Sequence, residues 1–127
     1  MRLVLTLSLV LVLLVACGPA TGPTATLRGI AVAGPTCPVV TDPPDPGCQD
    51  RPIGGARVLV TDASGSEVAS AVTDEDGHFS VELPPGTYRL VPQPVTGLMG
   101  TAAPVTVRVI HGAAMVPITL AYDTGIR

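Results

Sequence analysis

Apolar and polar residues alternate with a period of two through much of the chain between residues 54 and 90. The apolar positions that share one parity are Ala56, Val58 and Val60, then Phe79, Val81 and Leu83, then Tyr88 and Leu90. Such a period places one set of side chains on a buried face and the other toward water, as in a half-buried β-strand. Gly, Pro, Asp and Ser separate the runs at intervals of about ten residues, so the pattern indicates an all-β sandwich or barrel.

The same pattern continues on both sides of this stretch and predicts seven strands in total. Their approximate ranges are 26–32, 56–61, 67–73, 78–83, 87–91, 105–110 and 114–120. The turn at residues 62–65 ends in Gly65, which suits a position that needs a positive φ. Phe and Tyr total three and Trp is absent, so the core is expected to consist of Val, Leu, Ile and Ala.

Three motifs follow one another in this region: GGAxVxV at residues 54–60, TDxxGxF at residues 73–79 and LPPGxYxL at residues 83–90. In this order and spacing they resemble the carboxypeptidase regulatory-like domain, and the likeness covers about residues 26 to 120. The resemblance implies a prealbumin- or transthyretin-like, seven-stranded Greek-key β-sandwich. It says little about activity, because one fold hosts many functions.

The N-terminus predicts export. Residues 3–15 are apolar apart from Thr6 and Ser8 and follow a basic Arg2, and these thirteen residues are too few to span a bilayer. Residues 1–16 are therefore predicted to be a signal peptide. The sequence LVAC at residues 14–17 resembles a bacterial lipobox, which implies that Cys17 becomes the mature N-terminus and carries the lipid. The alternative is an ordinary secretory signal peptide with an incidental Cys.

The remaining domain organisation follows from composition. Residues 17–25 are small and rich in Gly, Pro and Thr, and they are predicted to be a flexible tether between lipid and domain. The β-sandwich is expected to cover residues 26–122, followed by a C-terminal tail at residues 123–127. A lipid on Cys17 would place the protein at the extracytoplasmic face of the cell membrane. The net charge of −3 makes a nucleic-acid partner unfavourable.

A Pro-rich segment at residues 33–52 holds Cys37 and Cys48. No second Cys pair or His lies nearby to complete a metal site, and export favours an oxidising compartment. With Cys17 lipidated, these two Cys are predicted to form a disulfide, against the alternative of two unpaired thiols. A rigid, exposed excursion of this kind is a candidate contact surface, or else an insertion that the fold tolerates.

A second long connection, residues 92–104, carries Leu98 and Met99 between two glycines. One interpretation is a binding loop, since Met is an adaptable contact residue. The other is that both side chains fold back and close one end of the sandwich. The sequence leaves these two interpretations open.

Asp74 and Asp76 make a weak calcium candidate, because Asp-x-Asp-Gly opens many calcium-binding loops. The twelfth position of such a loop, where a bidentate Glu is needed, is Pro85. The simpler interpretation is a hairpin turn in which Asp74 accepts backbone hydrogen bonds and Gly77 adopts a positive φ. We expect the structural role, with no metal and no cofactor.

No catalytic constellation is recognisable. The spacing of His78 and His111 does not match a zinc site, and no Ser lies in a G-x-S-x-G motif. The prealbumin fold also houses hydroxyisourate hydrolases, whose C-terminal Tyr-Arg-Gly-Ser signature is replaced here by YDTG at residues 122–125. We therefore predict that the chain is not an enzyme.

These observations together predict an exported, lipid-anchored, non-catalytic binding or scaffold module of the cell envelope, with a protein or glycan partner. One alternative is a carbohydrate-binding module, weakened by the scarcity of exposed aromatic residues. The other is a small extracytoplasmic hydrolase, weakened by the missing catalytic residues.

Overall fold

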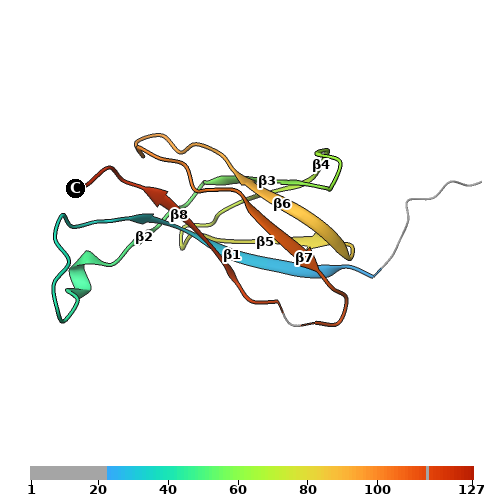
Figure 1. The fold of residues 1–127 in the computed structure, drawn as a ribbon, viewed down its shortest axis with the longest axis horizontal. Helices are drawn as coiled ribbons and strands as arrows, with labels where there is room; N and C mark the ends of the chain where they lie inside the picture. Colours follow the sequence, from blue (N-terminus) through green and yellow to red (C-terminus); the bar gives the residue numbers. More distant parts are fainter. Residues whose placement is uncertain (1–22, 114) are drawn as a thin grey trace, which may run out of the picture.

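The structure is a computed structural model that describes residues 23–113 and 115–127. It contains eight strands and one short 3-10 helix: β1 (Ala25–Gly34), η1 (Pro46–Cys48), β2 (Arg51–Pro52), β3 (Arg57–Thr61), β4 (Glu67–Val72), β5 (His78–Leu83), β6 (Gly86–Pro92), β7 (Val105–Val109) and β8 (Ile118–Asp123). The strands form two four-stranded sheets that pack face to face (Figure 1). The predicted all-β sandwich is confirmed.

β1 is the central strand of the first sheet. β5 and then β2 pair antiparallel with one edge of β1, and β8 runs parallel along its other edge. The second sheet has the order β4-β3-β6-β7, and each neighbouring pair in it is antiparallel. The chain passes from one sheet to the other several times, as a Greek-key sandwich requires.

The core lies between the two sheets and includes most of the residues whose parity predicted burial, together with residues of β1, β7 and β8. Its best-buried members include Leu27, Val58, Val60, Phe79, Leu83, Leu90, Val109, Leu120 and Tyr122. The single Phe packs closely on β1, because a Cβ at Gly29 would lie only 2.4 Å from Phe79 Cζ. Aliphatic side chains thus fill most of the core, as the composition indicates.

The strand count and the last strand differ from the prediction. The extra strand is β2, two residues that pair with Val32 and Ala33 inside the Pro-rich segment, where no alternation marks them. The last strand is Ile118–Asp123 instead of residues 114–120, because β8 pairs with the second half of β1 from Gly29 to Gly34. Asp123, the first residue of the predicted tail, is therefore the last residue of β8.

The two ends of the long axis differ in character (Figure 1). Ala25 pairs with Leu83 near the turn between β5 and β6, and this end also holds the 62–66 turn and the 110–117 connection. We call it the N-terminal end. β1 then runs ten residues, about 30 Å, to Gly34 at the other end. There the chain makes its longer excursions, residues 35–50 and 93–104, and this end we call the loop end.

Candidate functional site

The first excursion at the loop end is closed by a disulfide. Cys37 and Cys48 are bonded, with Cα atoms 5.3 Å apart, so the predicted pairing is confirmed. Asp45 caps η1 by accepting a 2.8 Å hydrogen bond from the Gly47 amide. The hydroxyl of Thr36 donates to the carbonyl of Gln49 across the base of the loop. The segment is thus fixed by a covalent bond and by local hydrogen bonds.

Two apolar side chains at the tip of this stapled segment face water. Val39 is 66% exposed and Val40 is 91% exposed. Isolated exposed valines are common on protein surfaces, so their position matters more than their number. They stand on a loop whose conformation the disulfide already restricts. Less conformational entropy is therefore lost when a partner binds them.

In the second excursion, Leu98 and Met99 lie in different environments, although they are neighbours in the sequence. Leu98 is half-buried and packs against the core cluster, with its amide donating to the carbonyl of Val95. Met99 is 79% exposed. Leu98 therefore helps to close the end of the sandwich, whereas Met99 is presented to solvent.

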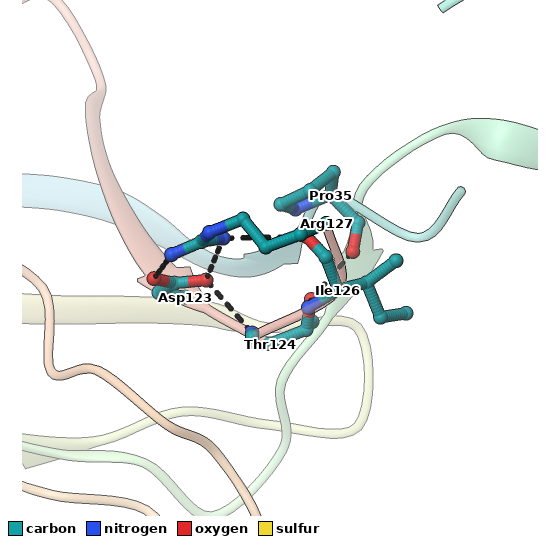
Figure 2. Close-up of polar contacts among 6 residues, drawn as sticks. Pro35, Asp123, Thr124, Ile126 and Arg127 are labelled. Atoms are coloured by element: carbon teal, nitrogen blue, oxygen red, sulfur yellow. Dashed lines mark hydrogen bonds and ion pairs between the residues drawn. The ribbon is translucent and has the colours of Figure 1, made fainter. Parts of the chain in front are cut away.

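The end of the chain joins both excursions, and Figure 2 shows its contacts with the first. Asp123 pairs with Gly100, and its carbonyl also accepts from the amide of Met99 at 2.9 Å. The next residue, Thr124, donates its amide to Gly34 at 3.1 Å and its hydroxyl to the carbonyl of Pro35 at 2.5 Å. Because Pro35 begins the stapled segment, residues 123–124 hold the base of one loop against the other.

An ion pair supports this junction. The guanidinium of Arg127 lies 2.8 Å from Asp123 Oδ2 and also donates to Oδ1, while the amide of Gly125 donates to Oδ1 at 2.8 Å (Figure 2). The hydrogen bond from Arg127, followed by that from Gly125, lowers the pKa of Asp123 to about 2. The carboxylate is therefore charged throughout the physiological pH range.

A shallow hollow of about 320 Å³ lies at the loop end, between the segments that flank the first excursion and the second excursion itself. On one side it is lined by Ala33 and residues 51–54, and on the other by residues 95–98. Arg51 is the charged side chain at its rim. The hollow therefore connects β2 and its neighbours at the base of the first excursion with residues 95–98 of the second.

The turn that holds Asp74 and Asp76 also lies toward the loop end, where the amide of Ala31 donates to the carbonyl of Gly77. Asp74 Oδ1 accepts from the amides of Asp76 and His78, at 3.0 and 2.9 Å, and Gly77 has φ +79°. These are the contacts expected of a turn-forming Asp. In residues 23–113 and 115–127, no three His, Cys, Asp or Glu side chains are grouped as metal ligands. Calcium binding by Asp74 and Asp76, the weaker alternative to this structural role, stays a hypothesis.

Some predicted features lie outside the described residues or away from this site. The signal peptide at residues 1–16, the lipidated Cys17 and most of the tether precede residue 23. His78 and His111 are both exposed. In the part of the chain that the structure covers, no helix is long and apolar enough to cross a membrane.

Sequence reasoning missed Tyr122 and Asp123 as structural residues. Tyr122 is 2% exposed, its hydroxyl donates to the carbonyl of Gln93, and burial raises its pKa. The spacing of Asp123 and Arg127 was the available signal for the ion pair, since it brings the two side chains within reach in a compact turn.

The fold defines an all-β sandwich domain with two long loops at one end. The family model of the carboxypeptidase regulatory-like domain matches residues 40–121, so the chain belongs to that family. The match begins inside the stapled segment, after Cys37, and covers every strand after β1 except the end of β8. No curated protein sequence matches the chain.

Two solved structures are similar to it. The Bacillus anthracis TIE protein has a TM-score of 0.56 and 15% identity over 77% of this chain, which corresponds to 17% of that chain. A streptococcal ancillary pilin has a TM-score of 0.46 and 19% identity over 78% of this chain and 32% of that one. The chain thus spans less than a third of either protein, and the first similarity supports the fold alone.

Proposed function

We propose that this protein is an exported lipoprotein of the cell envelope that presents a non-catalytic binding or scaffold module. One observation carries the proposal: β1 begins at the N-terminal end of the sandwich and finishes at the loop end, about 30 Å away. A lipid on Cys17, followed by a short tether, would hold the N-terminal end toward the membrane. The loop end would then face outward.

The loop end has the properties of a contact surface. Val39, Val40 and Met99 are exposed there, on excursions joined through Asp123 and Thr124. A surface that keeps its shape before binding loses little conformational freedom when a partner arrives. Membership of a family of accessory domains supports a binding or scaffold role in preference to catalysis.

The anchor is tested by replacing Cys17. In detergent phase partitioning, the wild-type protein is expected in the detergent-rich phase, and its mass should show loss of residues 1–16 and the addition of acyl chains. Cys17→Ala is expected in the aqueous phase. Cys37→Ala is the matched control, because it removes a Cys that is not in the lipobox and should leave partitioning unchanged. A Cys17→Ala protein that still partitions into detergent would contradict the anchor.

A further inference from the structure

The outer face of the second sheet carries three arginines. Val58, Leu90 and Val109 point into the core, so their neighbours point outward. These neighbours are Arg57 on β3, Arg89 on β6 and Arg108 on β7, and all three are exposed. This face is distinct from the loop end and from the N-terminal end.

The strand register places these residues in a diagonal row. Arg108 lies opposite Thr87 of β6, and Arg89 follows two residues further along the same strand. The amide of Gln93 donates to the carbonyl of Arg57, so Arg57 is level with position 93 of β6. The row therefore runs from the level of Thr87 to the level of Gln93, just after β6. These six residue steps make it about 20 Å long. We call it the arginine row.

The arginine row has no acidic partner among the described residues. The ion pair between Asp123 and Arg127 is the salt bridge found in residues 23–113 and 115–127, and it lies at the loop end. The nearest carboxylates on this face are Glu67, which pairs with Thr61, and Asp62 in the following turn. Asp62 Oδ1 accepts hydrogen bonds from the amide and hydroxyl of Ser64 and from the amide of Ser66, so this carboxylate is engaged within its own turn. The connection after β7, residues 110–117, contains no acidic residue.

A groove of about 570 Å³ runs beside the centre of the row. Arg89 lies in it between Thr61 on β3 and Thr106 on β7, and Thr87 and the carboxylate of Asp62 also line it. The groove therefore combines a guanidinium, which matches a planar anionic group through paired N–H donors, with hydroxyl groups that can both donate and accept. It has few of the aromatic surfaces on which neutral sugars stack.

We propose that the arginine row binds an acidic polysaccharide, with anionic groups meeting Arg89 and Arg108 and sugar hydroxyls meeting Thr87 and Thr106. The charge is complementary, since an otherwise acidic chain of net charge −3 gathers three exposed arginines on this face. The length of the row fits an extended chain better than a single sugar. Because the anionic group could be a carboxylate or a sulfate, the test separates them. The inference does not depend on the lipid anchor or on the loop end.

The test is binding of the detergent-purified full chain to four polymers at about 0.01 M salt, where screening is weak. Polygalacturonate carries carboxylates, dextran sulfate carries sulfates, dextran is the neutral match, and polyglutamate is an acidic peptide. We expect one or both acidic polysaccharides to bind, dextran not to bind, and affinity to fall steeply toward about 1 M salt. Arg89→Gln and Arg108→Gln should each weaken binding about tenfold or more.

Arg28→Gln is the matched control, because Arg28 is an exposed arginine on β1 in the other sheet. It removes the same charge and should change affinity less than about twofold. An equal loss with Arg28→Gln would overturn the proposal in favour of general charge attraction. Absence of binding to both acidic polysaccharides would overturn it, and binding to polyglutamate alone would replace it with an acidic protein partner.

Discussion

Thr73 shows how one buried hydroxyl joins two parts of the chain. It is 4% exposed, donates to the carbonyl of Ile53 at 2.5 Å and accepts from the amide of Ala56 at 2.9 Å. These contacts fix the approach to β3 against the end of β4. A buried backbone group without a partner costs about 1–3 kcal/mol.

Thr73→Val keeps the shape and removes both hydrogen bonds. We expect it to lower the free energy of unfolding by about 2 kcal/mol or more, measured by urea denaturation. Thr73→Ser is the control, because it retains the hydroxyl and should cost less. Equal stability of the Val and Ser variants would show that these hydrogen bonds do not stabilise the fold.

The ionisation of Asp123 makes the stability of the fold depend on pH. Its pKa is lowered from 3.8 to about 2 in the folded protein, chiefly by Arg127. A lowered folded-state pKa stabilises the fold above the unfolded value, and this stabilisation disappears as the pH falls through about 4 to about 2. We expect the melting temperature of the wild type to fall further across that pH window than the melting temperature of Asp123→Asn. Arg127→Gln should behave like Asp123→Asn, and identical acid profiles for wild type and both variants would contradict the role of the ion pair.

The core residues could be predicted from the sequence. Thr73 and Asp123, which join separate parts of the chain, could not. Alternation alone marks Val58, Val60 and Leu90, because burial in a strand follows a period of two. The roles of Thr73 and Asp123 depend on partners brought close only by the fold. Thr73 meets Ile53 from 20 positions away, and no local pattern records that contact.

The loop at residues 93–104 divides its two apolar residues between structure and surface. Leu98→Ala should cost about 1–2 kcal/mol, less than a fully buried Leu, because Leu98 is half-buried. Met99→Ala should change stability by no more than about 0.5 kcal/mol. Urea denaturation of both variants gives the comparison. An equal cost for the two would mean that Met99 also packs against the fold.

The disulfide is the main constraint on the stapled segment. Cys37 and Cys48 are 11 positions apart, and closing such a loop stabilises by about 3 kcal/mol on the chain-entropy model. Replacing both with Ser should therefore lower the melting temperature by several degrees. Reduction of the wild type should have the same effect and leave the double variant unchanged. An unaltered melting temperature would show that the segment is held by its hydrogen bonds alone.

Strand pairing explains where the prediction of elements failed. Seven strands were expected from alternation, but β2 contains only Arg51 and Pro52 and cannot show a period. β8 begins later than predicted because its register is set by β1, some ninety residues earlier in the chain. The second half of β1 needs a partner on that edge, and Ile118–Asp123 provides it. A contact between segments so distant leaves no signal within either one.

The sandwich holds three regions of its surface apart. The chain enters β1 at the N-terminal end, and the joined excursions occupy the loop end (Figure 1). The arginine row lies on the outer face of the second sheet. The sequence selected the two excursions but could not show that they meet. That result depends on Asp123 and Thr124, which bridge them in the folded protein.

A capture experiment from native membranes tests whether the loop end binds the partner, by comparing matched surface changes at the two ends of the sandwich. Val40→Ser with Met99→Ser alters the loop end at residues that are 91% and 79% exposed, and Val116→Ser alters the N-terminal end at a residue that is 83% exposed. Each change should leave the fold intact, because surface substitutions rarely exceed about 0.5 kcal/mol. We predict that the loop-end variant loses the proteins recovered with wild type, whereas Val116→Ser retains them. Recovery that persists in the loop-end variant and disappears with Val116→Ser would contradict the account.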